Sequence, residues 1–239
     1  MNMEKLYIVM PAYNEENTVE KVVDEWHAVA ERVGQGSKLV VFNDGSKDDT
    51  AGVLEKLKNK YPNLIVVNKE NSGHGPTCRL AYQYAVDEKA DWVFQTDSDG
   101  QTKSGDFPGF WEKRNQYDFI IGRRAKRSDS VARKSISQIL KMVLFMIFGV
   151  VVADANTPFR LMKAERLRHY LPLIPHDYFL CNTLLSVLIT KNKERIFWRE
   201  ISFVPRASGK SSIPLVRFGR LGIKLVAQLY KMRGLKLPQ

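Results

Sequence analysis

Apolar and polar positions alternate in a repeated order through the first hundred residues. Three times, a short apolar run leads through a polar turn into a segment with apolar residues at helical spacing. The runs are 6–10, 39–42 and 64–68, and helices are expected at 17–32, 50–60 and 76–88. Asn17 and Glu20 fit a capping box at the first helix. The repeat predicts an α/β fold with a mostly parallel, Rossmann-like sheet and helices on both faces.

A fourth apolar run, 92–96, ends at Asp97. In open parallel sheets, ligands bind beyond the carboxyl ends of the strands. We therefore expect the turns PAYNEE, NDGS and DSDG, which follow the first, second and fourth strands, to meet in one site.

The pattern is less regular beyond residue 118. Residues 119–121 are expected to form another strand, and 123–134 read as a charged loop with four arginines and two lysines. A helix of twenty residues, with an apolar stretch at 139–152, a helix at 179–190 and a strand at 196–204 are expected next. An amphipathic helix is expected at 213–232.

Composition narrows the class of protein. The chain has 239 residues, 44% hydrophobic and 26% charged, which excludes disordered, collagen-like and disulfide-scaffold proteins. Cys78 and Cys181 form no CxxC pair, so we expect reduced thiols and a cytoplasmic location. We expect no secretory signal, and the longest uncharged apolar run, 142–153, is too short to span a bilayer.

Charge is distributed unevenly. Residues 1–100 have 11 Lys and Arg against 17 Asp and Glu, whereas residues 101–239 have 26 against 9. The second part therefore carries the whole basic excess and is expected to meet an anion: nucleic acid, a phosphorylated substrate or a lipid surface.

The clearest candidate chemistry is Asp97-Ser98-Asp99. Carboxylates at i and i+2 after a strand can hold one divalent cation, Gln101 adds an oxygen ligand, and the cation neutralises a diphosphate. A solvated turn is the alternative, and the position after an apolar strand favours the site, whose loop we expect to be exposed. Tyr13 could stack on a nucleobase, and Asp44 could accept a hydrogen bond from a base or ribose.

Other motifs are set aside. The GHG turn lacks a third glycine, and GKS at 209–211 lacks the first glycine of a phosphate loop. No histidine has metal-ligand spacing, so all four are interpreted as surface or turn residues: His27, His74, His169 and His176. No close Asp/His pair for deprotonating a hydroxyl is visible.

Taken together, VMPAYNEEN, VVFNDGSKDDT, NSGHGPT and FQTDSDGQT resemble the nucleotide-sugar domain of family 2 glycosyltransferases, which have the GT-A fold. The second half, with IGRR at 121–124, DANTPFR at 154–160 and RASGKS at 206–211, resembles the polyprenyl-phosphate hexose synthases, such as dolichol-phosphate mannose synthase. The resemblance covers residues 5–212.

The resemblance implies a role for each matching residue. Nucleotide contacts are implied for Pro11, Tyr13, Glu15, Phe42, Asp44, Ser98 and Arg206. Asp97, Asp99 and Gln101 would bind Mg²⁺ or Mn²⁺ and the diphosphate, with Arg124 on the phosphates. Acceptor-phosphate contacts are implied for Arg123, Arg133, Ser137 and Lys210. Three positions depart from the pattern, Asn43, Asn182 and Ser212, and the last two bear on the acceptor.

These observations predict a single GT-A domain, with a nucleotide-sugar half at 1–122, an acceptor half at 123–212 and a basic amphipathic helix at 213–239. The expected reaction is inverting transfer of a hexose from a nucleotide sugar to a polyprenyl phosphate. A saccharide hydroxyl acceptor is the alternative, and Asp154 would then be the base. A nucleic-acid-binding protein is a weaker alternative, because three acidic loops would repel a phosphate backbone.

The segment at 213–232 is the basis for predicting membrane association. At 100° per residue, four cations share a stripe about 60° wide: Arg217, Arg220, Lys224 and Lys231. The alternative is a helix packed on the domain. The stripe lacks acidic residues, and 139–152 offers a second apolar helix, so we expect peripheral binding at the cytoplasmic face of a membrane.

Overall fold

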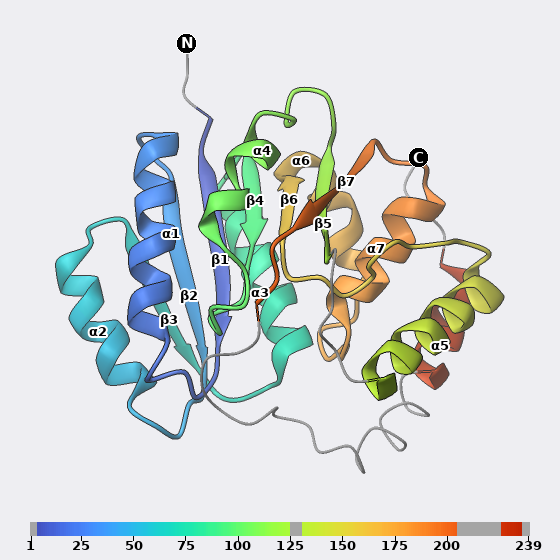
Figure 1. Ribbon diagram of the computed structural model, residues 1–239, viewed down its shortest axis with the longest axis horizontal. Coiled ribbons are helices and arrows are strands. Elements are labelled where there is room, and N and C mark those ends of the chain that lie inside the picture. The colour runs from blue at the N-terminus through green and yellow to red at the C-terminus, as the bar shows by residue number, and fades with distance from the viewer. Residues whose placement is uncertain (1–3, 125–130, 205–225, 236–239) are drawn as a thin grey trace.

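One seven-stranded sheet organises the chain, for which a computed structural model describes residues 4–124, 131–204 and 226–235 (Figure 1). The strand order is β3-β2-β1-β4-β6-β5-β7. All neighbouring strands are parallel except those paired with β6, so the prediction of a mostly parallel sheet is confirmed. The strands are β1 (Leu6–Ala12), β2 (Lys38–Asp44), β3 (Leu64–Lys69), β4 (Trp92–Gln95), β5 (Phe119–Arg124), β6 (Arg160–Lys163) and β7 (Ile196–Ile201).

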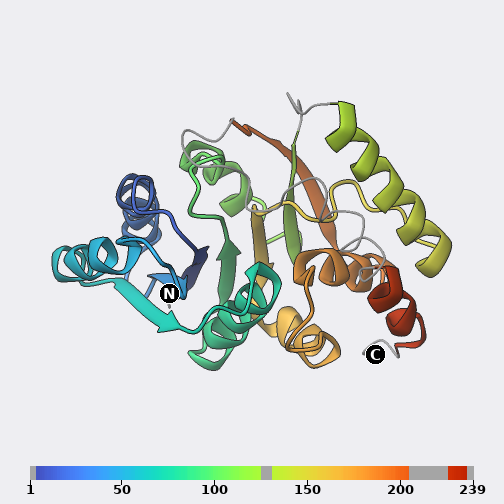
Figure 2. The ribbon, with the colours of Figure 1, turned by 90° about the horizontal axis from the view of Figure 1, so that it is seen from below.

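Helices cover both faces of this sheet, as predicted (Figure 2). One face packs against α1 (Val19–Val33), α2 (Thr50–Lys60) and α4 (Pro108–Trp111). The other packs against α3 (His74–Asp87), α6 (Ala164–Tyr170) and α7 (Cys181–Lys191). Short 3₁₀ turns lie at η1 (Ser104–Asp106), η2 (Leu171–Leu173) and η3 (Met232–Gly234). Trp26 of α1 is fully buried against Phe94 of β4, which fixes this helix on its face.

Helix α5 (Val131–Phe148) lies at the end of the molecule opposite α2, beside the helical residues 226–231 (Figures 1 and 2). Leu144 and Phe148 of α5 join Leu229 in the core. Gly149, in the left-handed region at φ 69°, ends the helix earlier than the predicted residue 152.

Several local predictions are wrong. The first helix begins at Val19 after Thr18, and no side-chain cap forms, because the Thr18 hydroxyl donates to Glu15 instead. The GHGP turn is itself the first turn of α3. β6 and α6 were missed, because the run Arg160–Lys163 is short and begins with a charged residue.

Cys78 and Cys181 are buried, and neither forms a disulfide in the described structure. Within the described ranges, no helix combines the length and apolarity needed to cross a membrane.

Candidate active site

The turns after β1 and β2 are tied together by hydrogen bonds at the carboxyl edge of the sheet. The backbone N–H of Asn14 donates to Ser46 Oγ at 3.0 Å, and that of Lys47 donates to Asn14 Oδ1 at 2.8 Å. The N–H of Glu15 donates to Thr50 Oγ1 at 2.8 Å. Tyr13, half-buried in this frame, is the one aromatic ring of the turn. The expected convergence of the first two turns is therefore present.

Asp44 is held by the protein itself. Lys69 Nζ and the backbone N–H groups of Ser72 and Gly73 all donate to its carboxylate. Burial opposes ionisation, but these hydrogen bonds and the Lys69 charge lower the pKa of Asp44 below its usual value. The predicted hydrogen bond that Asp44 would accept from a base or ribose would compete with this anchoring of the turn that follows β3.

Phe42 and Pro11 belong to the frame of the site. Phe42 is 1% exposed and packs edge-on against Tyr84 in the core. Its side chain is therefore not available as the nucleotide contact implied by the resemblance, because β2 turns it into the apolar layer beneath α3. Pro11 is also buried, and its carbonyl accepts a hydrogen bond from Ser98 Oγ at 2.9 Å. Ser98 thus joins the β1 and β4 ends through its side chain.

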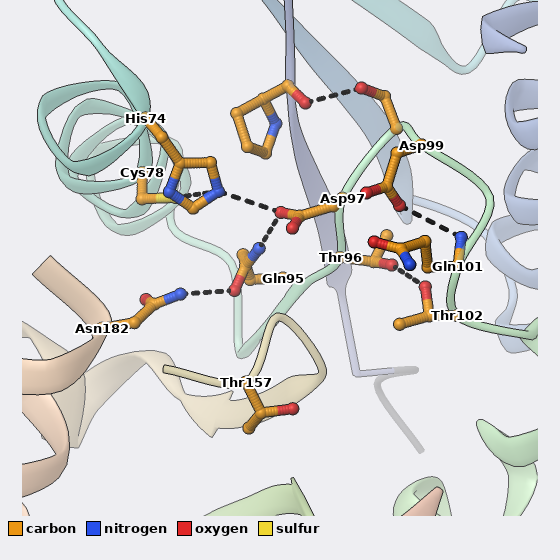
Figure 3. A network of polar contacts seen from close by, with 12 residues as sticks. His74, Cys78, Gln95, Thr96, Asp97, Asp99, Gln101, Thr102, Thr157 and Asn182 are labelled. Carbon is orange, nitrogen blue, oxygen red and sulfur yellow. Dashed lines mark hydrogen bonds and ion pairs between the residues drawn. The ribbon is translucent and has the colours of Figure 1, made fainter. Parts of the chain in front are cut away.

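The two carboxylates after β4 each have one oxygen bonded to the protein (Figure 3). Asp97 Oδ1 accepts from Gln95 Nε2 at 3.0 Å, and Asp99 Oδ1 accepts from the backbone N–H of Gln101 at 3.0 Å. The Asp97 side chain is 23% exposed, so this loop is half-buried rather than exposed as expected. Burial and the neighbouring Asp97 charge raise the pKa of Asp99 to about 6.

His74 is a member of this site that sequence reasoning missed. Its Nε2 lies 3.1 Å from Asp97 Oδ1, and both ring nitrogens lie 3.7 Å from the Cys78 sulfur. Cys78 and Asp97 raise the pKa of His74 well above its usual value. His74 is exposed in the first turn of α3, in keeping with its interpretation as a surface or turn residue, but the expectation of no close Asp/His pair is wrong. The available signal was its position after β3, in a sheet whose strand ends converge.

The segment after β7 runs beside the DSDG loop. Val204 donates its N–H to Gln101 O at 2.9 Å, and Gln101 Nε2 donates to Val204 O at 3.0 Å. Because the side-chain nitrogen of Gln101 donates to Val204 O, its Oε1 points away from that carbonyl. Phe203 bridges to Thr102, and the Arg124 guanidinium lies 5.2 Å from the Phe203 ring centre. These contacts bring Arg124 toward the carboxylate loop.

Arg124 and Asp154 form a two-pronged ion pair. Nε and Nη2 of Arg124 donate to the two oxygens of Asp154 at 2.8 and 2.7 Å, and both side chains are largely buried. Arg123 points to the opposite face of β5 and pairs with Glu200 of β7. The expectation of a loop at 123–134 is wrong here, because β5 continues to Arg124 and strand alternation separates the two arginines.

The remaining predicted residues are only partly placed. Arg133 and Ser137 lie four apart on α5, and the structure describes their backbone but not their side chains. Arg206, Lys210 and Ser212 lie outside the described residues, as do Arg217, Arg220 and Lys224 of the predicted stripe. Lys231 is described and exposed. Asn182 is 2% exposed, so this departure lies inside the protein rather than on a surface that an acceptor could touch.

A family model described as glycosyl transferase family 2 matches residues 7–186, which include the ends of β1, β2, β4 and β5. This chain belongs to glycosyl transferase family 2. The resemblance to family 2 is thus confirmed.

Curated relatives of this family 2 chain include transferases with polyprenyl phosphates in their names. A dolichyl-phosphate beta-glucosyltransferase of Trichomonas vaginalis is 31% identical over 176 residues, 66% of this chain and 53% of that protein. An undecaprenyl-phosphate 4-deoxy-4-formamido-L-arabinose transferase of Pectobacterium carotovorum is 26% identical over 232 residues, 95% of this chain and 68% of that protein. The chain therefore spans about half the length of the first relative.

Solved structures support the GT-A fold. Glucosyl-3-phosphoglycerate synthase from Mycobacterium tuberculosis, in complex with Mn²⁺, uridine diphosphate and phosphoglyceric acid, superposes with a TM-score of 0.70. The match covers 99% of this chain and 80% of that one at 17% identity. The complex with phosphoglyceric acid alone gives the same TM-score at 18% identity.

The carboxylate pair fits a divalent cation. Its donors are hard oxygen atoms, and the pKa of Asp99 is raised by burial and by repulsion from Asp97, of which a bound cation would relieve the repulsion. Across the described ranges, no group of three or more His, Cys, Asp or Glu could hold a metal by itself. Asp97 and Asp99 would therefore share the ion with ligand oxygens, as is usual for Mg²⁺ bound with phosphates.

Proposed function

We propose that this family 2 glycosyltransferase moves a hexose, with inversion, from a nucleotide sugar to a polyprenyl phosphate at a membrane surface. The observation that best supports this proposal is the half-buried Asp97/Asp99 pair at the end of β4. The relatives of the chain are named for dolichyl-phosphate and undecaprenyl-phosphate transfer. The basic second part of the chain supports an anionic acceptor.

The residues of the site divide the work of transfer. Asp97 and Asp99 would hold Mg²⁺ or Mn²⁺, which when bound neutralises the leaving diphosphate. The guanidinium of Arg124, held by Asp154 and Phe203, would add a positive charge of defined orientation for the diphosphate. Tyr13, Glu15 and the Ser98 backbone line the adjoining end of β1, where the nucleotide would lie.

A lipid phosphate needs no strong base, because its attacking oxygen is already an anion. A saccharide hydroxyl does need one, and Asp154 was the candidate. Both of its oxygens accept hydrogen bonds from Arg124, and a carboxylate engaged in this way is poorly placed to take a proton. The Arg124–Asp154 ion pair therefore favours a phosphate acceptor over a hydroxyl acceptor. Membership of family 2 favours a glycosyltransferase over the alternative of a nucleic-acid-binding protein.

The outer face of α5 supports membrane association. Four large apolar side chains, spaced along one stripe of the helix, are each more than half exposed: Ile139, Met142, Phe145 and Met146. Val226 and Tyr230 of the adjoining helical segment are also exposed. No acidic residue occurs between 131 and 153. An apolar stripe of this kind fits burial at the acyl-chain boundary, with the cytoplasmic leaflet as the proposed location.

A transfer assay tests the proposed reaction. Purified protein would be incubated with UDP-, GDP- or dTDP-hexose, Mn²⁺ or Mg²⁺, and either a polyprenyl phosphate or an oligosaccharide. We expect the sugar to appear in the lipid fraction with one nucleotide, and EDTA to abolish the transfer. Transfer to the oligosaccharide but not to the lipid would overturn the acceptor, and full activity in EDTA would overturn the metal.

A further inference from the structure

A buried chain of hydrogen bonds ends on the same oxygen of Asp97 that His74 contacts (Figure 3). Its members come from three elements: Tyr82 of α3, Asn182 of α7 and Gln95 at the end of β4. Each is at most 2% exposed. None can therefore contact a ligand directly, and any influence on the reaction must pass through Asp97.

The polarity of this chain is fixed from one end to the other. The Tyr82 hydroxyl donates to Asn182 Oδ1, and burial raises the Tyr82 pKa well above its usual value, so the proton stays in place. Asn182 Nδ2 then donates to Gln95 Oε1 at 3.0 Å, and Gln95 Nε2 donates to Asp97 Oδ1 at 3.0 Å. An ionised carboxylate only accepts hydrogen bonds, so both amides must face this way.

The helices that carry the chain are held at close range. A Cβ atom on Gly75 of α3 would lie 2.2 Å from Phe179 O, in the backbone that leads into α7. Glycine at this position therefore lets the start of α3 lie against that backbone. The result is that Asp97 receives two donors on Oδ1, from Gln95 and His74, while its Oδ2 has no protein hydrogen bond among the described residues.

We propose that Gln95, Asn182 and Tyr82 are positioning residues that orient the Asp97 carboxylate toward a divalent cation and its diphosphate, and that position 182 must be an amide for this purpose. The inference rests on the proposed function, since it assigns the cation to Asp97. An acid at 182 would remove the 3.0 Å donor to Gln95 Oε1 and leave only the longer contact with the Tyr82 hydroxyl, at 3.3 Å. The Gln95 amide could then turn, and its oxygen would face the Asp97 carboxylate.

The test measures cation binding, not transfer. Mn²⁺ affinity of the full chain would be determined by electron paramagnetic resonance, with and without UDP or GDP. Because supporting residues of metal sites typically affect affinity by about 10–100-fold, we expect Asn182→Asp and Gln95→Leu to weaken Mn²⁺ binding by about tenfold or more. Tyr82→Phe should weaken it less. Tyr84→Phe, which removes a hydroxyl from the same helix but outside the chain, should bind as wild type does.

A double variant shows whether Asn182 acts through Gln95. We expect Gln95→Leu/Asn182→Leu to bind Mn²⁺ no more weakly than Gln95→Leu alone, whereas independent effects would add. The unfolding temperature of each variant would be recorded, and near-isosteric Asn182→Asp keeps the comparison valid if a leucine variant fails to fold.

The outcomes separate the two proposals. If the variants bind Mn²⁺ as tightly as wild type, the positioning role is overturned, even if transfer to polyprenyl phosphate is found. If wild type transfers no sugar but the Mn²⁺ affinities follow the expected order, the positioning role holds and the proposed function fails. If wild type binds no Mn²⁺ with or without nucleotide, the positioning role is overturned.

Discussion

The two ends of the sheet hold their polar side chains in different ways. Around β1 to β4, turn carboxylates and amides bond mainly to backbone N–H groups and neutral side chains, and Asp97 and Asp99 each have one oxygen without a hydrogen bond to the residues that the structure describes. Around β5 to β7, arginines pair with carboxylates, as in Arg124–Asp154 and Arg195–Asp118. The first end therefore keeps negative charge available for a cation, whereas the second uses its charges to fix geometry.

The largest effect is expected when one carboxylate around β1 to β4 is removed. Asp99→Asn should lower transfer by about 100-fold or more, the usual range for a lost electrostatic contact at the reacting charge. The pKa of about 6 means that the ionised form of Asp99 is disfavoured in the folded protein, so the unfolding temperature at pH 7 should stay the same or rise. A variant that is inactive because it unfolds would contradict this explanation.

Breaking the Arg124–Asp154 pair tests whether the charges around β5 to β7 fix the geometry of the site. Asp154→Ala leaves a largely buried guanidinium without this partner, and removing one member of such a pair costs about 3 kcal/mol. We expect a lower free energy of unfolding by urea titration, together with reduced transfer. Asp154→Asn should retain measurable transfer to polyprenyl phosphate, because no base is required. A complete loss of transfer in a stably folded Asp154→Asn would favour the hydroxyl acceptor.

Changing the α5 stripe should affect location without affecting chemistry. Phe145→Ser with Met142→Ser removes two exposed apolar side chains, so flotation with vesicles rich in anionic lipid should fall several-fold. Transfer to a short, water-soluble polyprenyl phosphate should be retained. Leu80→Ser, which alters an exposed leucine on α3, is the matched control and should float as wild type does. Wild type that stays with the soluble fraction at low salt would end the membrane proposal.

The smallest expected effect concerns the Asp44 anchor. Its pKa is lowered in the folded state, so it stabilises the fold above the usual aspartate pKa and loses that contribution as pH falls through the lowered value. Asp44→Asn should therefore be less stable than wild type at pH 7, and the difference should shrink toward pH 3. Urea titrations at both pH values measure it, and a difference that grows on acidification would contradict the assignment.

Sequence reasoning succeeded where local pattern and topology agree. The runs that became β1 to β4 are apolar and bounded by polar turns, and parallel strands bring their carboxyl ends to one edge, so the grouping of Asp97 with the β1 turn followed. It failed at β6, a short strand that starts with a buried arginine, and it ended the strand at 119–121 too early, because β5 continues through Arg123 and Arg124, which resemble a loop in sequence.

The same limit applies to the missed contacts of the site. His74 reaches Asp97 from a residue 23 positions away, and Asn182 acts from 87 positions beyond Gln95. No periodicity encodes such pairs. They follow from the packing of α3 and α7 on one face of the sheet, which only the folded chain displays.

The most direct test of the account is transfer from labelled nucleotide hexoses to a polyprenyl phosphate, measured in parallel for wild type and Asp99→Asn, with Mn²⁺ and with EDTA. The account predicts that label enters the lipid fraction only with wild type and metal. Labelled lipid formed equally well by Asp99→Asn or in EDTA would contradict the assigned role of the carboxylate pair. Label found only on hydroxyl acceptors would contradict the proposed reaction.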